Sequence, residues 1–196
     1  MINHLLRLLF ILPFLWVFSQ AAMAQDKMER ELRIKEIEVP KEAKEWISDT
    51  FETTKRLKWY QEIYESGYSF EAKFKSKGKF YSVEFDSLGL IQDVEIEIDF
   101  KEIPRDVRTG LEKELSPDYK KSDIKRLQIQ YSGASEDLKD FFHKNSFKRI
   151  LTRYEIEYIG LDEKGVSEFW EGLFSDEGKL IRKRKIVVTP SENLVF

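Results

Sequence analysis

Four carboxylates near the middle of the chain have types and spacing that chemistry could use. Asp93, Glu95, Glu97 and Asp99 alternate with apolar residues, so on a strand they share one face, with neighbours about 7 Å apart. Such a row offers oxygen ligands for calcium or an acid and a base for glycoside hydrolysis. A general acid needs a raised pKa, however, and the alternation predicts an outer sheet face on which all four carboxylates are solvated. They are therefore weak metal candidates, and we expect no metal site.

Other catalytic chemistry has little support in the sequence. The chain has no cysteine, which excludes thiol catalysis and cysteine-ligated zinc. His143 is the single histidine beyond the N-terminal apolar segment, and no G-x-S-x-G, P-loop or G-x-G-x-x-G motif is present. With 36 acidic and 33 basic residues, the chain is not a highly basic nucleic-acid binder. We expect no catalytic residue, no cofactor and no nucleic acid, and predict that the protein is not an enzyme.

Aromatic side chains form a better candidate site. If Trp59 and its alternating neighbours face a helix, Tyr60 and Tyr64 point to the opposite sheet face. Phe80 joins them by the same parity, as does Phe169 if Trp170 takes the place of Tyr81. Aromatic residues on a charged face are typical anchors of protein interfaces. The candidate partner-binding residues are Tyr60, Tyr64, Phe80, Phe169, Phe141 and Phe142. The alternative is that these rings only pack against a neighbouring strand, another repeat or a helical insertion.

The first 24 residues are typical of a secretory signal peptide. Arg7 is followed by an apolar run from Leu8 to Phe18, and Ala22-Met23-Ala24 supplies an A-x-A cleavage signal. The alternative is a membrane anchor, which needs about 20 apolar residues, but proline and polar residues interrupt the run. We predict cleavage near Ala24-Gln25 and a periplasmic or secreted protein that does not span a membrane once processed.

The rest of the chain carries one pattern twice. Val39-Pro40-Lys41-Glu42 and Ile103-Pro104-Arg105-Asp106 each place a proline at the start of an amphipathic helical segment. Period-two alternation follows each helix and predicts strands with one buried face. The turns Asp86-Ser87-Leu88-Gly89 and Ser175-Asp176-Glu177-Gly178 also correspond. We therefore predict an α+β fold of two tandem repeats, each a short helix packed on a four-stranded antiparallel sheet.

The second copy differs from the first in length and in charge. Its extra residues lie mostly at about 133–152, where Ser135-Glu136-Asp137 predicts the capped start of a short helix. The closing strand of the first copy, expected to run to Phe100, is acidic. That of the second, expected over Leu180–Val188, carries the basic run Arg182–Lys185, a solvated strand that discourages edge-to-edge aggregation.

These patterns set the predicted organisation. It consists of a signal peptide over 1–24, an N-terminal extension over 25–37, repeat 1 over 38–101 and repeat 2 over 102–190, with the insertion at about 133–152.

The order of the motifs resembles the PepSY-like family of exported bacterial proteins, which is related to the beta-lactamase-inhibitor-protein type of fold. The resemblance covers about residues 38 to 188 and rests on Val39-Pro40-Lys41, Leu57-Lys58-Trp59, 68–74 and 79–86 with Gly89, echoed by Ile103-Pro104, 154–157 and 174–178. It implies a small secreted domain, usually without catalytic residues, in which related modules bind or inhibit other proteins. The better-known inhibitors of this fold carry disulfides, which this chain cannot form, so beta-lactamase inhibition is not inferred.

We therefore expect a non-catalytic periplasmic module that binds a protein or peptide of the cell envelope, inhibitor-like in character, as a monomer or weak homodimer. Binding would use the exposed sheet face, the insertion or both. Two alternatives stay open. One is an envelope hydrolase or calcium-binding protein that uses the acidic strand. The other is a self-associating structural protein in which the acidic strand of one copy meets the basic strand of another.

Overall fold

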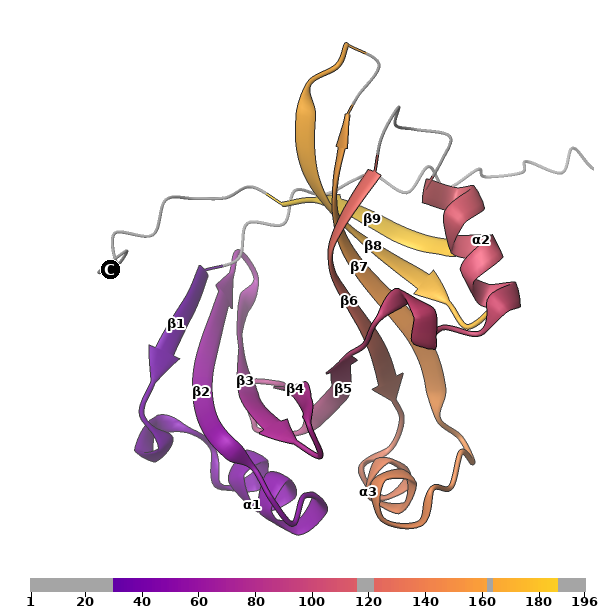
Figure 1. Cartoon of the computed structure of the whole chain (residues 1–196). Helices are drawn as coiled ribbons and strands as arrows, with labels where there is room; N and C mark the ends of the chain where they lie inside the picture. Colours follow the sequence, from indigo (N-terminus) through magenta and orange to yellow (C-terminus); the bar gives the residue numbers. More distant parts are fainter. Residues whose placement is uncertain (1–29, 116–121, 162–163, 187–196) are drawn as a thin grey trace, which may run out of the picture.

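The computed structural model describes residues 30–115, 122–161 and 164–186 (Figure 1). The predicted signal peptide over 1–24 and the end of the last predicted strand, beyond 186, lie outside these residues. The elements are β1 (Arg30–Ile34), η1 (Glu36–Glu38), α1 (Lys41–Thr50), β2 (Lys55–Tyr64), β3 (Gly67–Ser76), β4 (Lys79–Phe85), β5 (Ile91–Glu97), η2 (Phe100–Glu102), α2 (Arg105–Leu115), β6 (Ser122–Ser132), α3 (Ser135–Lys144), β7 (Leu151–Leu161), β8 (Ser167–Ser175) and β9 (Leu180–Lys185).

All nine strands belong to one antiparallel sheet, and each pairs with its neighbours in sequence, in the order β1 to β9. The α+β class and the antiparallel sheet are confirmed. The four-stranded sheets expected for the two halves are joined into one, because β5 pairs with β6 from Asp93↔Ser132 to Glu97↔Gln128. The predicted N-terminal extension also contributes β1, which pairs with β2 through Arg30↔Ile63 to Ile34↔Trp59.

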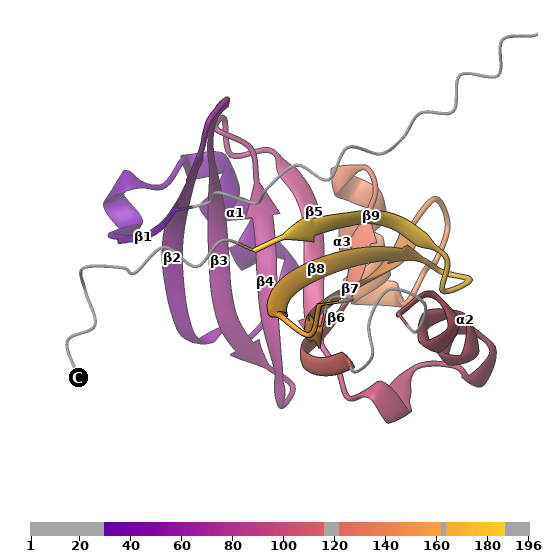
Figure 2. The same cartoon turned by 90° about the horizontal axis from the view of Figure 1, so that it is seen from above.

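The sheet is strongly curved, so that β1–β4 and β6–β9 face each other with β5 between them (Figure 1). The helices lie on the convex side, and the view from above shows the same arrangement (Figure 2). We call the side that carries the helices the outer face and the concave side the inner face. The two groups of strands thus form the two walls of the inner face, and β5 forms its floor (Figure 1).

Two hydrophobic cores lie under the outer face. The first joins Ala43, Trp46 and Ile47 of α1 to strand residues that point toward the helices, such as Val83 and Phe85. The second joins Val107, Leu111 and Leu115 of α2 to Ile156 and Phe174, among others. The helical spacing of these residues buries one stripe of each helix against the sheet.

Helix α3 packs on the first core, although it follows β6 in sequence. Leu138 is fully buried among the residues of the first core, and Phe142 contacts Phe51 with ring centroids 5.2 Å apart. Nε1 of Trp46 in α1 donates a hydrogen bond to Oγ of Ser135, at 3.0 Å. The segment predicted as an insertion in the second repeat therefore completes the core of the first half.

The Ser135 hydroxyl provides a test of this contact. Ser135→Ala is expected to lower the free energy of unfolding by about 1–2 kcal/mol, because it leaves the indole N–H of the buried Trp46 unpaired. Ser48→Ala is the matched control, since Ser48 is exposed and donates only to the carbonyl of Glu45 in its own helix. Urea unfolding measures both, and an equal effect of the two changes would contradict the proposed contribution of the hydrogen bond.

Two local predictions differ from the structure. β5 ends at Glu97, and Asp99 precedes η2, where its backbone N–H donates to the Glu102 carboxylate at 2.8 Å, so Phe100 lies in a 3-10 turn rather than in a strand. Helix α3 begins at Ser135 after Ala134, whose side chain has no capping acceptor, and the Ser135 hydroxyl accepts a hydrogen bond from Trp46. Among the described residues, no helix is long and apolar enough to cross a bilayer.

Two turns fix the helices on the sheet in the same way. Gly89, after β4, has φ +82 and lies against Pro40 and Ala43 at the start of α1. Gly178, after β8, has φ +75 and lies against the backbone of Val107 and Leu111 in α2. Glycine is needed at both positions, because the left-handed conformation disfavours other residues and a Cβ would strike the helix backbone or Pro40.

Candidate functional site: the inner face of the sheet

Strand alternation places polar residues on the inner face opposite the two cores. Register across the sheet aligns rows of side chains on this face, such as Lys73, Ser82, Glu95, Gln130 and Arg153 on neighbouring strands. Several of these polar residues are buried by the curvature, with Glu95 6% and Gln130 8% exposed. The concave face is therefore a polar surface that is partly withdrawn from water.

The inner face contains a pocket of about 350 Å³, here called the acidic pocket. Side chains from all nine strands line it. Eight carboxylates and four cations contribute: Glu31, Glu62, Glu71, Glu84, Asp93, Glu95, Glu155 and Glu157, with Lys73, Arg126, Arg182 and Arg184. The excess of acidic groups in a partly buried site disfavours ionisation of all of them together.

Two of the four sequence-predicted carboxylates have raised pKa values in this pocket. Burial, with Glu155 adding to it, raises the pKa of Asp93 to about 7. Burial and the charge of Asp93 raise the pKa of Glu95 to about 8, although Nε2 of Gln130 donates to Glu95 Oε1 at 3.0 Å. Burial, together with Glu62 and Glu71, also raises the pKa of Glu84. The expectation that the carboxylate row is solvated is therefore wrong for Asp93 and Glu95, because the curvature of the sheet covers them.

The four candidates for metal binding do not form one cluster. Glu97 and Asp99 are exposed, and Asp99 lies beyond the end of β5. Among the described residues, the carboxylates that lie within 4.8 Å of one another belong to Glu31, Glu62 and Glu71 instead. Lys73 Nζ lies 2.5 Å from Glu31 and 2.9 Å from Glu71, so an ammonium group already balances this trio.

Lys73 is the central cation of the first half. Burial lowers its pKa, but the Glu71 and Glu31 carboxylates outweigh this effect and hold the pKa above its usual value. Its ammonium group also lies 5.0 Å from the ring centroid of Tyr60, a favourable cation–π distance.

Arginines balance the acidic residues of the second half. Arg184 donates to Oε1 of Glu171 from Nε at 3.1 Å and from Nη2 at 2.6 Å, and Glu171 is 1% exposed. Arg126 of β6 forms an ion pair with Glu157 of β7. The basic run of β9 is therefore partly engaged in ion pairs on the inner face, while the strand itself lies at the sheet edge.

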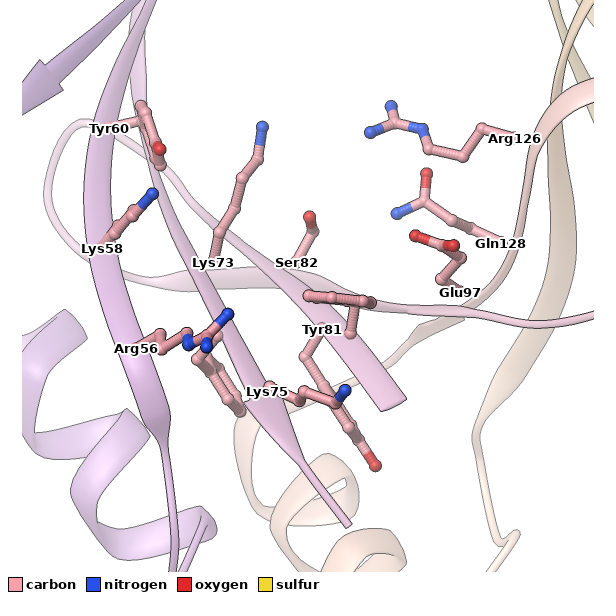
Figure 3. A pocket seen from close by; sticks show the side chains of 12 residues that line it. Arg56, Lys58, Tyr60, Lys73, Lys75, Tyr81, Ser82, Glu97, Arg126 and Gln128 are labelled. Carbon is pink, nitrogen blue, oxygen red and sulfur yellow. The ribbon is translucent and has the colours of Figure 1, made fainter. Parts of the chain in front are cut away.

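A second pocket of about 300 Å³, here called the basic pocket, adjoins the first. Its lining includes five cations, one carboxylate and four aromatic rings: Arg56, Lys58, Lys73, Lys75, Arg126, Glu97, Tyr60, Phe74, Phe80 and Tyr81 (Figure 3). Lys73 and Arg126 line both pockets and separate them. The inner face is thus divided into an acidic part and a basic, aromatic part.

The structure brings four of the predicted aromatic residues to the inner face. Tyr60 and Phe80 line the basic pocket and Phe169 lines the acidic pocket, while Tyr64 lies at the end of β2 opposite Gly67. Phe80 is 53% exposed. The structure places the other two, Phe141 and Phe142, on the outer side, where Phe141 is buried and contacts Tyr131 with centroids 4.5 Å apart. These two rings do not share a surface with the other four.

Several residues of the inner face were not predicted as site residues. Arg126, Gln128 and Gln130 alternate with Leu127 and Ile129 on β6, so their shared face is readable from the sequence. The pattern does not show that the curvature of the sheet brings the polar side of β6 close to β2 and β3, with which it lines one pocket.

Comparisons with protein-family models and with curated proteins find no match. Among solved structures, a DUF2874 family protein from Bacteroides ovatus aligns with a TM-score of 0.52 and 12% identity, over 75% of this chain and 87% of that chain. A protein proposed to be periplasmic, from Bacteroides eggerthii, aligns with a TM-score of 0.51 and 13% identity, over 79% and 93%. A BLIP-like protein from Bacteroides fragilis aligns with a TM-score of 0.49 and 15% identity, over 77% and 89%.

The structural neighbours of the chain are thus BLIP-like and DUF2874 proteins. The similarity to the DUF2874 protein is one of fold. None of these three structures is described as PepSY-like, so that part of the resemblance stays a prediction.

Proposed function

We propose that the chain is a binding module of the cell envelope that holds a partner protein against the inner face of its sheet. The observation that carries this proposal is the inner face itself, a concave surface with two adjoining pockets of opposite charge and a half-exposed aromatic ring, Phe80. Interfaces combine such aromatic anchors with polar surroundings. The protein is not expected to need a cofactor for this role.

The envelope location rests on two observations. The sequence over 1–24 has the features of a signal peptide, and one structure of similar fold is proposed to be periplasmic. We expect cleavage near Ala24-Gln25.

The halves are proposed to be copies of one unit over 38–101 and 102–190. A helix followed by four strands occurs in each, α1 with β2–β5 and α2 with β6–β9. The geometry of the turns supports this duplication: Gly89 N donates to Asp86 O and Gly178 N to Ser175 O, both at 2.9 Å.

Phe80 and Phe147 provide a matched pair for testing the binding face. Both are phenylalanines of similar exposure, 53% and 59%, but Phe147 contacts Phe141 on the helix-bearing side. A photo-crosslinking phenylalanine analogue at position 80 is expected to capture a partner in living cells, and the same analogue at position 147 is not. Phe80→Ala is expected to weaken binding of the captured protein by about 1–2 kcal/mol, or about five- to thirtyfold, and Phe147→Ala by less than about twofold. Capture from position 147 but not from position 80 would overturn the proposal.

A second candidate function is acid–base catalysis by the carboxylates of the acidic pocket. It is favoured by the raised pKa values of Asp93 and Glu95, since a general acid must hold its proton near the working pH. If the protein is a hydrolase of this type, Glu95→Gln abolishes turnover of any substrate found. If it is a binding module, the change leaves capture from position 80 intact.

The self-association alternative is less well supported. Strand β5 already pairs with β4 and β6, so its backbone cannot pair with the basic strand of another copy. The module is proposed to act as a monomer or weak homodimer.

A further inference from the structure

The basic pocket has more positive charge than the carboxylates around it balance. Lys73 is paired with Glu31 and Glu71, and Arg126 with Glu157. For the other three cations, Arg56, Lys58 and Lys75, the described part of the chain offers no ion pair with a carboxylate. The pocket thus presents these three cations against one further carboxylate, Glu97, and the remaining positive charge is what a ligand can neutralise.

The backbone of β2 is distorted where it meets this pocket. The register with β3 shifts between Lys55 and Lys58, and Arg56 has φ 59, in the left-handed region. Leu57 packs against the first core, and its neighbours Arg56 and Lys58 point to the opposite side of the strand and line the pocket. Bulges commonly redirect side chains next to functional sites, and a non-glycine residue in this conformation is strained.

Aromatic rings form the other part of the lining. Lys75 Nζ lies 5.0 Å from the centroid of Phe80, and the rings of Phe74 and Tyr81 stack with centroids 5.3 Å apart. Figure 3 shows Arg56, Lys58 and Lys73 on one side and Arg126, Gln128 and Glu97 on the other, with Tyr81 below them. A ligand in this pocket therefore meets cations and apolar ring surface together.

We infer that the basic pocket binds an acidic segment of the partner protein, in which carboxylate side chains alternate with an aromatic or large apolar one. This inference rests on the proposed function and names the chemistry of the partner. A volume of about 300 Å³ is at the lower end for ligand pockets, so it receives one or two side chains of an extended segment. Charge complementarity makes the pocket selective for acidic segments. The carboxylates of the segment are attracted to the basic pocket and repelled by the adjoining acidic pocket, which fixes their position on the inner face.

The test uses a fluorescein-labelled peptide of alternating glutamate and phenylalanine, with a glutamine-for-glutamate peptide as control. Fluorescence anisotropy with the purified full chain is expected to show binding of the glutamate peptide that weakens with added salt, and binding of the glutamine peptide at least about tenfold weaker.

Three variants separate binding from stability. Lys58→Gln/Lys75→Gln is expected to weaken peptide binding about tenfold, whereas Lys113→Gln/Lys148→Gln, which removes two exposed lysines outside the pocket lining, changes it less than about twofold. Arg56→Gly is expected to weaken binding while keeping or raising the melting temperature, because glycine accepts the left-handed conformation without strain.

Each outcome decides a different claim. Equal binding of the two peptides, or equal effects of the two lysine pairs, overturns the inference about the basic pocket. Capture from position 80 that is insensitive to Lys58→Gln/Lys75→Gln also overturns it but leaves the proposed function standing. Absence of capture from position 80 overturns the proposed function, whatever the peptide does.

Discussion

Raising the pH from 6.0 to 8.5 is expected to lower the free energy of unfolding by about 2 kcal/mol, and the melting temperature by about 6 °C. Asp93 and Glu95 titrate in the folded protein at about 7 and about 8, but near 4 in the unfolded chain. Between these values the folded state keeps protons that the unfolded state has released, so stability falls as pH rises through the folded pKa values. Because the charge of Asp93 itself raises the pKa of Glu95, and Glu71 acts on both carboxyls, their contributions do not add in full.

The double variant Asp93→Asn/Glu95→Gln should reduce this slope, and buried Glu84, whose pKa is also raised, keeps the remainder. The double variant is expected to match the native chain at pH 6.0 and to exceed its stability by about 2 kcal/mol at pH 8.5, because the amides carry no charge to bury. Glu97→Gln, on the same strand but exposed, is the control and should keep the native slope. Calorimetric melting across this pH range measures all three proteins. A native chain with constant stability, or a double variant with the native slope, would contradict the burial of charge that the structure indicates.

Gly178→Ala is expected to destabilise the protein by about 2–5 kcal/mol. A Cβ at this position would lie 2.3 Å from the carbonyl oxygen of Val107 and 2.9 Å from the amide nitrogen of Leu111. Both are helix backbone atoms that cannot move without shifting α2. The left-handed conformation adds about 1–2 kcal/mol, and the forced separation of turn and helix about 1–3 kcal/mol.

Gly165→Ala separates these two contributions. Gly165 has φ +79, but a Cβ there would meet nothing within 4 Å in the described structure. It should therefore cost only about 1–2 kcal/mol from backbone strain. Urea unfolding of the two variants gives the difference, and a difference near zero would show that the close approach of Gly178 to α2 contributes little.

Local patterns in the sequence predict most of the elements, because one stripe or one face of each is apolar. Ala43, Trp46 and Ile47 repeat at helical spacing and do form the buried side of α1. The alternation around Trp59 likewise places Tyr60 on the opposite sheet face. The pairing of β5 with β6 is not readable in this way, since alternation defines the faces of a strand but not its neighbours.

The inner face is only partly predictable from the sequence, because alternation defines the side on which a residue lies but not what covers that side. The sequence places Asp93 and Glu95 on one side of a strand, and that placement is correct. Their burial depends on the curvature of the whole sheet, which brings Glu155 and Arg153 from β7 to the same site. Alternation alone predicts that this side of the strand is solvated, and therefore that the pKa values of the two carboxyls are not raised.

The position of α3 has a consequence for cooperativity. Leu138 is fully buried in the core that α1 and β2–β5 build, yet it follows β6 in the chain. The first half therefore cannot complete its core until β6 has paired with β5 and α3 has formed. Although the sequence pattern divides near residue 101, we expect the described chain to unfold in a single transition. A fragment ending near that boundary would expose apolar surface that only the second half can cover.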